Sequence, residues 1–272
     1  SAGDEVTDHQ IATYHKDGFL VIENLLDPEE VKQLSIRLNT FQSLKHLPNV
    51  ICEEGGDIRS IFAPNRHDEL YERLYRLQRL VAPTQQLVEE EVYLYQYKLN
   101  LKNAFSGKAW EWHQDFAYWH LDDGVQEPKM ISVMIYLSDV RSYQGPLMVI
   151  PGSHLFDVVR FQDKEHLRDA TTLLNSLGAD LKYTVHQHQI AELAKQNGIK
   201  VLEYQAGTGI FFHPNLCHAS TGNMSPFKRD TSIITYNSVA NPPKHHNRPS
   251  FVCSNDYRPV ASLSTSLVNA YQ

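Results

Sequence analysis

Cysteine is scarce in this chain, and basic residues are fewer than acidic ones. The 272 residues include Cys52, Cys217 and Cys253, and none of them belongs to a C-x-x-C pair. An odd number of scattered cysteines argues against a disulfide framework or a zinc–cysteine site, so we expect reduced thiols in a cytoplasmic enzyme. The formal net charge of -7 and the pI of about 6.0 argue against a nucleic-acid-binding surface.

The sequence also lacks long apolar runs and a leader segment. No run approaches the roughly 18 residues that span a bilayer, and the N-terminus has no basic and apolar signal regions. We therefore expect no membrane association, and no feature of the sequence indicates an obligate protein partner. Residues 1–3 lack an initiator methionine and are expected to be left over from cloning. No flexible linker interrupts the chain, so residues 1–272 are expected to form one domain.

Helix signals dominate the first third of the chain. A capping-box pattern begins at Thr7, and Asp27 followed by Pro28 begins a second helix that should extend to about Phe41. Leucines at helical spacing predict further helical structure from 67 to 90, with a break at Pro83.

Strand signals dominate the rest of the chain. Alternating and β-branched residues predict strands at 19–22, 58–63, 92–101, 131–137, 147–150, 201–204, 209–213 and 231–236. Helices followed by many short strands predict a mainly β fold with helical cover, arranged as a double-sheet jelly roll. The polar stretch 157–200, with one helix expected from 187 to 196, is long enough to be a lid-like insertion over a site.

The stretch around His113-Gln114-Asp115 contains the first chemical signal, although a histidine two residues before an aspartate is common by chance. If this stretch is a strand, the side chains of His113 and Asp115 share one face. Two histidines and one carboxylate hold the metal of non-haem Fe(II) oxygenases and leave coordination positions open. A second histidine is therefore needed. His213 and His218 are the candidates, and we favour His218.

Arg229 follows His218 by eleven residues, after a turn that lets the chain double back. We expect Arg229 on the neighbouring strand and close to the metal, where a guanidinium suits bidentate capture of the distal carboxylate of 2-oxoglutarate. An isolated arginine would more often form a surface ion pair, for example with Asp230. The combination with the other motifs favours the cosubstrate role.

Three groups of residues together resemble a known family. They are His113-x-Asp115, the run Gly145 to His154, and His218-x-Ser220 with Arg229. They resemble the phytanoyl-CoA dioxygenase family, and within it the sequence is most similar to bacterial free-leucine hydroxylase and ectoine hydroxylase, over roughly residues 8–250. The resemblance implies a double-stranded β-helix (jelly roll, cupin-like) that uses Fe(II), 2-oxoglutarate and O2, with ascorbate as the reductant in vitro.

The resemblance also implies roles for single residues. The iron ligands and catalytic centre would be His113, Asp115 and His218, and Arg229 would anchor 2-oxoglutarate. Further cosubstrate contacts are expected from Asn100, Ser132, Gln96 and Ser220. Substrate contacts are expected from Trp119 and Lys98, although the first could equally be a core aromatic and the second a solvated surface lysine.

The same resemblance bears on the substrate. Ectoine hydroxylase has an aromatic residue where Ile233 stands and a glycine where Ala219 stands, and the aromatic difference argues against ectoine. No basic cluster suits the phosphates of coenzyme A. Related halogenases have a small residue in place of Asp115, so hydroxylation is favoured over halogenation.

We therefore predict a dioxygenase that hydroxylates an unactivated C–H bond of a small, leucine-like free amino acid and releases succinate and CO2. One alternative keeps this chemistry but acts on another small metabolite, such as a natural-product intermediate of secondary metabolism. A second alternative is a catalytically inactive jelly-roll binding or sensor protein. The complete ligand set and Arg229 argue against that second alternative.

Overall fold

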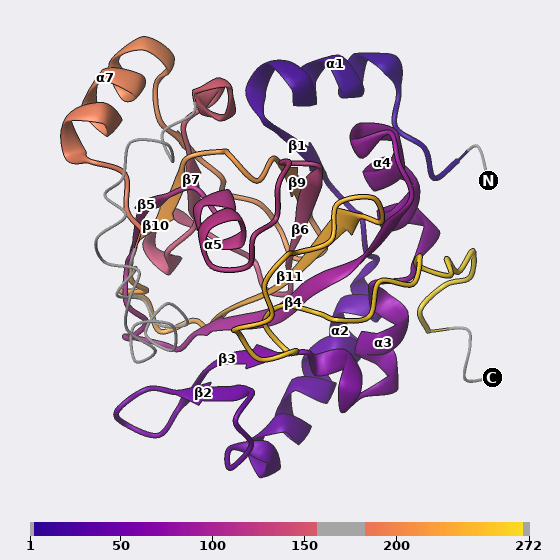
Figure 1. Cartoon of the computed structure of the whole chain (residues 1–272). Helices are drawn as coiled ribbons and strands as arrows, with labels where there is room; N and C mark the ends of the chain where they lie inside the picture. Colours follow the sequence, from indigo (N-terminus) through magenta and orange to yellow (C-terminus); the bar gives the residue numbers. More distant parts are fainter. Residues whose placement is uncertain (1–2, 157–182, 269–272) are drawn as a thin grey trace.

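The computed structural model describes residues 3–156 and 183–268, in which two antiparallel sheets pack against each other (Figure 1). The larger sheet has seven strands in the order β1-β9-β6-β11-β4-β3-β2, and the smaller has four in the order β5-β10-β7-β8. The bounds are β1 (Phe19–Ile22), β2 (Val50–Cys52), β3 (Ile58–Phe62), β4 (Val92–Lys102), β5 (Trp110–His113), β6 (Met130–Tyr136), β7 (Leu147–Val149), β8 (Lys200–Val201), β9 (Gly209–Phe212), β10 (His218–Ser220) and β11 (Arg229–Ser238). This arrangement confirms the expected jelly roll.

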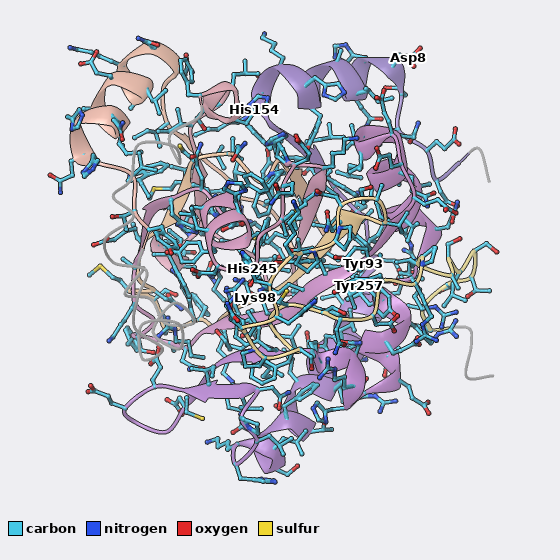
Figure 2. The ribbon with its side chains drawn as sticks, viewed as in Figure 1. Asp8, Tyr93, Lys98, His154, His245 and Tyr257 are labelled. Carbon is cyan, nitrogen blue, oxygen red and sulfur yellow. The ribbon has the colours of Figure 1, made fainter. Side chains whose placement is uncertain are left out.

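Helices cover the larger sheet on the face that points away from the smaller sheet (Figure 1). They are α1 (Asp8–Asp17), α2 (Pro28–Leu38), α3 (Glu69–Leu74) and α4 (Gln78–Val88). The first residue of α1, Asp8, is exposed at the edge of the molecule (Figure 2). The remaining helices are α5 (Phe116–Leu121), α7 (Gln187–Asn197) and the short 3-10 helices η1 (Asn39–Leu44), η2 (Pro64–Arg66), η3 (Ser142–Gln144) and η4 (Ser153–Leu155).

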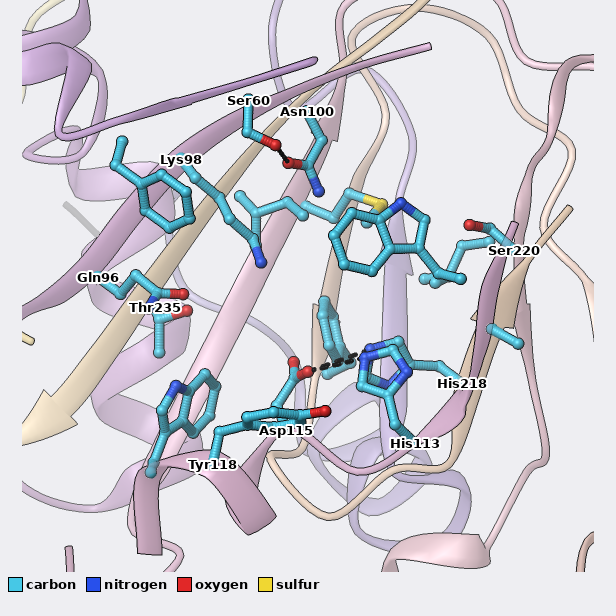
Figure 3. Close-up of a pocket in the computed structure, with 18 of the residues that line it drawn as sticks. Ser60, Gln96, Lys98, Asn100, His113, Asp115, Tyr118, His218, Ser220 and Thr235 are labelled. Carbon is cyan, nitrogen blue, oxygen red and sulfur yellow. Dashed lines mark hydrogen bonds and ion pairs between the residues drawn. The ribbon is translucent and has the colours of Figure 1, made fainter. Parts of the chain in front are cut away.

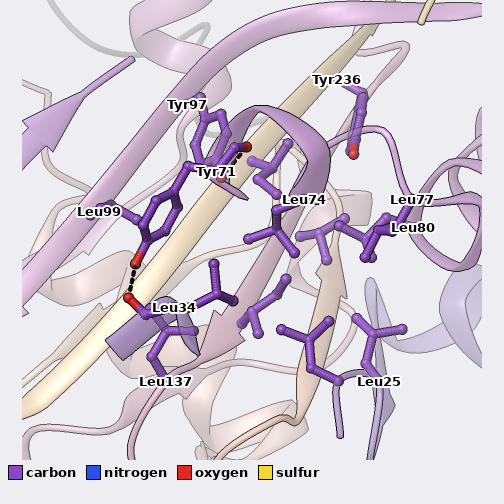
Figure 4. Close-up of a cluster of buried hydrophobic side chains, with 14 of the residues drawn as sticks. Leu25, Leu34, Tyr71, Leu74, Leu77, Leu80, Tyr97, Leu99, Leu137 and Tyr236 are labelled. Carbon is purple, nitrogen blue, oxygen red and sulfur yellow. Dashed lines mark hydrogen bonds between the residues drawn. The ribbon is translucent and has the colours of Figure 1, made fainter. Parts of the chain in front are cut away.

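Alternation along β6 separates two hydrophobic cores. Ile131, Val133 and Ile135 point toward the helices, whereas Met134 and Tyr136 point toward the smaller sheet. The core beneath the helices also contains buried tyrosines whose hydroxyls donate to backbone carbonyls (Figure 4). The Tyr71 hydroxyl donates to the Leu34 carbonyl at 2.8 Å, and the Tyr97 hydroxyl donates to the Tyr71 carbonyl at 3.0 Å. Both hydroxyls are hydrogen-bonded, so the two rings bury apolar surface without leaving a buried polar group unpaired.

The helix starts follow the sequence. Thr7 accepts a hydrogen bond from the Gln10 amide at 3.2 Å while the Gln10 side chain accepts from the Thr7 amide at 2.8 Å. Asp27 and Glu30 form the same reciprocal cap at 2.8 and 3.0 Å, with a proline at the first helical position. Both predicted capping signals are confirmed.

The predicted break at Pro83 is wrong, because this residue lies inside α4. The helical region instead breaks between α3 and α4, where Leu77 pairs with Leu263 and the Gln78 amide donates to the Leu263 carbonyl at 2.7 Å. A distant part of the chain therefore interrupts the helix, which no local signal indicates. Pro83 is the sixth of the eleven residues of α4, so the helix continues past it without the hydrogen bond that an amide at this position would donate to the Arg79 carbonyl.

For other elements, the observed bounds differ from the predicted ones. α2 ends at Leu38 and continues as the 3-10 helix η1, and the strand expected at 201–204 is the shorter β8. The helix expected from 187 to 196 is confirmed as α7. The rest of the lid-like insertion, from 157 to 182, lies outside the described residues. Within them, no helix is long and apolar enough to cross a membrane.

Candidate metal centre

The smaller sheet places two histidines face to face. His113 ends β5 and His218 begins β10, and the two are register partners with ring centroids 4.2 Å apart. Nδ1 of His113 lies 2.6 Å from the Glu111 carbonyl oxygen, and Nδ1 of His218 lies 2.9 Å from the Leu216 carbonyl oxygen. Because a carbonyl only accepts hydrogen bonds, each Nδ1 holds the proton and each Nε2 is free to bind a metal.

Asp115 reaches the same point by a different route from the one expected. The strand ends at His113, and Asp115 has helical backbone angles (φ -62°, ψ -34°) immediately before α5. The expectation that the two side chains share one strand face is therefore wrong, because the chain turns between them. The amide of Phe116, the first residue of α5, donates to the Pro214 carbonyl at 2.9 Å and ties this turn to the β9–β10 connection.

The three side chains converge on one position (Figure 3). Oδ1 of Asp115 lies 3.2 Å from Nε2 of His113 and 3.4 Å from Nε2 of His218. In the described part of the chain, this is the one group of three or more histidine, cysteine or acidic side chains close enough to hold a metal, with ligand atoms within 4.8 Å of one another. Two imidazoles and one carboxylate match the ligand set preferred by non-haem Fe(II).

The electrostatics of the group also suit a cation. Burial by itself would raise the pKa of Asp115, but the two imidazoles outweigh it and hold that pKa well below its usual range. Burial lowers the pKa of His113, and the neighbouring His218 lowers it further. Burial opposes protonation of His218 too, but Asp115 raises its pKa. An ionised carboxylate beside two imidazoles is therefore the state that the site favours.

His213, the other candidate ligand, lies elsewhere. Its ring is near Tyr14 and His154, and its Nδ1 accepts from the Asn215 amide at 3.0 Å. Burial, with the neighbouring His154 and His15, lowers the pKa of His213 to about 3. This residue therefore belongs to the packing between α1 and η4, and it does not join the metal group.

The opposite wall of the pocket is the inner face of the larger sheet. Alternate residues of β4 point into the pocket, and they are Gln96, Lys98 and Asn100. They lie opposite Thr235, Ile233 and Thr231 of β11, respectively. The register of one strand pair therefore fixes the order of polar and apolar groups along this wall.

Arg229 begins β11 and is 2% exposed. It was expected on the strand next to His218, and this is wrong, because β10 and β11 belong to different sheets. The guanidinium faces the pocket from the opposite wall, and it forms no hydrogen bond or ion pair with any described residue; its Nε is buried without an acceptor. Burial lowers the Arg229 pKa to about 10, so the group remains a cation at neutral pH. An unpaired buried guanidinium fits a carboxylate ligand.

The remaining residues expected in the site are distributed as follows. The pocket is lined by Gln96, Lys98, Asn100, Trp119 and Ser220. Ser132 does not line it, and its hydroxyl instead lies 2.8 Å from that of Thr235, which does.

Arg248 lines the pocket but has no signal in the sequence. It lies in the irregular segment after β11 and is 7% exposed. Its Nε and Nη2 donate to the two carboxylate oxygens of Asp123 at 2.7 and 2.5 Å, and the Tyr95 hydroxyl donates to the same carboxylate. No hydrophobic periodicity or motif spacing in the sequence marks this arginine as a pocket residue, so only the tertiary structure shows that it lines the pocket.

Comparisons with known proteins agree with this geometry. The family model described as phytanoyl-CoA dioxygenase (PhyH) matches residues 14–231. The chain is 38% identical to L-proline trans-4-hydroxylase of Streptomyces griseoviridis, over 92% of this chain and 93% of the relative. It is 33% identical to ectoine dioxygenase of Nocardia farcinica, over 94% and 88%. The solved structure of EctD from S. alaskensis with 2-oxoglutarate and 5-hydroxyectoine superposes with a TM-score of 0.83 at 28% identity, covering 97% of this chain and 89% of that one.

Proposed function

The chain belongs to the phytanoyl-CoA dioxygenase family and is an Fe(II)- and 2-oxoglutarate-dependent hydroxylase, and we propose that its substrate is a small free amino acid with an aliphatic, leucine-like side chain. We assign iron binding to His113, Asp115 and His218, and binding of the distal carboxylate of 2-oxoglutarate to Arg229. When bound, Fe(II), 2-oxoglutarate and O2 together supply the oxidant for C–H hydroxylation, with succinate and CO2 as by-products.

The contribution of the protein is placement. The two Nε2 atoms and the Asp115 carboxylate fix the metal position, and Arg229 fixes the far end of the cosubstrate. The C–H bond held nearest to the metal is the one that reacts, so the pocket walls select it. His113 and His218 are buried and Asp115 is partly exposed, so the pocket limits the access of water to the reacting groups.

The observation that supports an amino-acid substrate is a second unpaired cation on the same wall. The Lys98 ammonium points into the pocket (Figure 3) and has no hydrogen-bonding or ion-pairing partner in residues 3–156 and 183–268. Lys98 is opposite Ile233, four residues along β11 from Arg229, or roughly 13 Å of strand. If Arg229 binds the cosubstrate, Lys98 is available for a carboxylate of the substrate.

The electrostatic surroundings of Lys98 support this assignment. Burial lowers the Lys98 pKa, Asp115 raises it, and the nearby Arg248 and Arg59 lower it further. An incoming carboxylate favours the charged ammonium. Nη1 of Arg248 also donates to no described residue, so a second donor is available beside Lys98.

Gln96 extends this half of the pocket. It is opposite Thr235, two residues beyond Lys98 and away from Arg229, and its Nε2 donates to the Val252 carbonyl at 2.9 Å. The Gln96 carbonyl oxygen is therefore the free end of the amide, and we propose it as an acceptor for the substrate ammonium group. This places Gln96 with the substrate and not with the cosubstrate, for which the sequence suggested it.

Apolar side chains complete the pocket. Trp119, Met134, Phe212 and Ile233 all contribute to its lining. An aliphatic side chain gains roughly 25 cal/mol for each Å² of apolar surface that it buries against them. Ile233 stands where ectoine hydroxylase has an aromatic residue, so the wall of this pocket has one ring fewer. This difference supports an amino acid over ectoine as the substrate.

The test is a substrate panel with the purified chain, Fe(II), ascorbate and 2-oxoglutarate. We expect one of leucine, isoleucine, valine or proline to gain one oxygen atom by mass spectrometry, with equimolar succinate. Hydroxylation of ectoine or of another compound that is not an amino acid would overturn the proposal. Absence of substrate-stimulated succinate formation across the amino acids of the panel would also overturn the proposed substrate class.

A substitution at Lys98 distinguishes the proposed binding site of the substrate carboxylate from that of the cosubstrate carboxylate. Lys98→Met is expected to raise the KM for the amino acid roughly 10²-fold, the loss expected when one partner of a buried charge pair is removed. The KM for 2-oxoglutarate should change little. Lys32→Met, at an exposed position of α2, is the control. Equal increases in both KM values would contradict the assignment of Lys98 to the substrate.

A further inference from the structure

The run from Pro151 to His154 belongs to the family resemblance but has no role in the assignments above. It forms the turn after β7 and the start of η4, and Ser153 is 0% exposed. Hydrogen bonds connect this region to both chain segments that carry the proposed iron ligands. One segment is the turn that contains His113 and Asp115, and the other leads from β9 to His218.

The pairing of β5 with β10 does not by itself fix the three ligand side chains. The two strands pair at His113 and His218. They pair again at Trp110 and Ser220, after an irregularity in the register. Asp115 lies beyond the end of β5 and has no partner in this pairing. The separation between its carboxylate and the two imidazoles therefore depends on contacts outside the sheet.

Ser153 holds the segment that precedes His218. Its hydroxyl oxygen accepts a hydrogen bond from the Cys217 amide at 2.8 Å, and the Cys217 carbonyl accepts one from the Ile150 amide at 3.1 Å. Cys217 is 0% exposed, so water cannot replace either bond. Both backbone polar groups of the residue next to His218 are therefore bonded to the segment that joins β7 to η4.

Gln114 holds the other segment. It stands between His113 and Asp115 and is 2% exposed. Its Nε2 donates to the Asn215 carbonyl at 2.7 Å and to the Phe156 carbonyl at 3.1 Å. Asn215 belongs to the β9–β10 connection, and Phe156 directly follows η4. One amide group therefore joins the ligand-bearing turn to the β9–β10 connection and to η4.

The orientation of this amide is determined by its two neighbours. Both are carbonyl groups, which only accept hydrogen bonds, so Nε2 must face them and both of its hydrogens are used. Oε1 of Gln114 is buried without a donor among the described residues, which costs free energy. Reversing the amide would lose both bonds from Nε2. The side chain is therefore fixed between the two segments despite its unpaired oxygen.

η4 is itself fixed to the end of α1. The Gly152 amide donates to the Asp17 carbonyl at 2.8 Å, and Nε2 of His154 (Figure 2) donates to the His15 carbonyl at 2.8 Å. The His154 ring packs directly on Gly18, where an added Cβ would lie 2.5 Å from Nδ1 of the ring. η4 is thus a common anchor whose own position does not depend on either ligand-bearing segment.

This inference rests on the proposed function, because it concerns the iron site. We propose that Ser153 and Gln114 are positioning residues that hold the two ligand-bearing segments against η4, at the separation that the metal requires. In this arrangement Oδ1 of Asp115 lies 3.2 and 3.4 Å from the two Nε2 atoms. Loss of either positioning residue frees one segment from η4, so the three donors must be brought together again when metal binds. Loss of the second residue then adds little, because the fixed separation is already gone.

The experiment is a titration of metal-free protein with Co(II), whose visible absorption reports both affinity and coordination geometry. Wild type, Ser153→Ala, Gln114→Met and the double variant form a double-mutant cycle. Each single variant is expected to bind Co(II) about 10- to 100-fold more weakly, the range for outer partners of metal ligands. The double variant should bind about as weakly as the weaker single variant. At saturating Co(II), all three spectra should differ from that of the wild type.

Gln86→Met is the matched control. Gln86 also makes two hydrogen bonds, to the Val6 amide and carbonyl at 2.8 and 3.0 Å, but it lies in α4 on the far face of the larger sheet. Its substitution should lower stability and leave both the Co(II) affinity and the spectrum as in the wild type.

Three results would overturn the inference. They are wild-type Co(II) affinity and spectrum in Ser153→Ala, the same result in Gln114→Met, and losses that add up in the double variant. If a variant at Gln114 does not fold, Ser153→Ala decides alone, because wild-type Co(II) binding in that variant contradicts a role for η4. Failure of the wild type to bind either Co(II) or Fe(II) would instead disprove the proposed function.

Discussion

His218 and Arg229 are eleven residues apart in the sequence, yet they face the pocket from opposite walls. His218 begins β10 in the smaller sheet, and Arg229 begins β11 in the larger one. The connection between them is held by Asn223, which is 2% exposed and whose Nδ2 donates to the carbonyls of Lys102, Asn103 and Phe227 at 3.3, 3.2 and 2.6 Å. This anchored turn sets the spacing between the metal and the carboxylate-binding guanidinium.

Arg229 is therefore the first residue to test. Arg229→Gln should raise the KM for 2-oxoglutarate roughly 10²-fold, because one partner of a desolvated charge pair is lost. Arg229→Lys keeps a charge but loses the planar pair of donors, so an intermediate increase of about tenfold is expected. Steady-state succinate formation at saturating substrate measures both. Arg66→Gln, at an exposed position, should leave the KM unchanged, and an unchanged KM in Arg229→Gln would refute the assignment.

The metal ligands give a second prediction. His113→Ala, Asp115→Ala and His218→Ala each remove one donor from a group of three, and each should lower turnover at least ~10²-fold, since loss of even an indirect partner of a metal ligand costs 10- to 100-fold. Titration with Fe(II) should show weaker binding in all three variants. His213→Gln is the control, because His213 lies outside the group. Retained iron binding in His218→Ala, with loss in His213→Gln, would reverse the assignment.

The sequence predicted those parts of the molecule that depend on local chemistry. Helix caps at Thr7 and Asp27 satisfy amides within three residues, so they can be recognised without any knowledge of the fold. The alternation of β4 and β6 was visible for the same reason. The ligand set was predicted from the His113-x-Asp115 pattern with a distant histidine and supported by the family resemblance, and the structure brings all three side chains together.

Long-range contacts account for what the sequence did not predict. The break between α3 and α4 depends on Leu263, and the position of Arg229 depends on which sheet β11 joins. Asp115 reaches the site through a turn, because the start of α5 is tied to the Pro214 carbonyl of the β9–β10 connection. Arg248 becomes a pocket residue only because Asp123, at the end of α5, holds its guanidinium.

That buried pair gives a third prediction. Arg248 and Asp123 are 7% and 0% exposed, and their ion pair is bidentate. Arg248→Met leaves the buried Asp123 carboxylate without its cationic partner, and the free energy of unfolding should fall by about 3–5 kcal/mol. Equilibrium denaturation in urea measures this change.

The double variant Arg248→Met with Asp123→Leu separates two causes of the loss. It should be more stable than Arg248→Met alone, because no buried charge is left unpaired. Arg258→Gln breaks an exposed ion pair with Asp256 and should have no measurable effect. If Arg248→Met were as stable as the wild type, the pair would not be buried as described.

His213 gives the fourth prediction, which concerns acid stability. Burial, with His154 and His15, lowers its pKa in the folded protein to about 3, against 6.5 for an ordinary histidine. Below pH 6.5 the unfolded chain therefore binds a proton that the folded chain does not, and stability falls as the pH decreases. The loss of stability from this one group is up to about 1.4 kcal/mol for each pH unit.

His213→Gln cannot titrate, so its stability relative to the wild type should improve by about 2–3 kcal/mol between pH 6.5 and pH 4.5. Urea denaturation of metal-free protein at each pH tests this, with His9→Gln at an exposed position of α1 as the control. A difference between wild type and His213→Gln that stays constant with pH would show that the pKa of His213 is the same in the folded and unfolded protein.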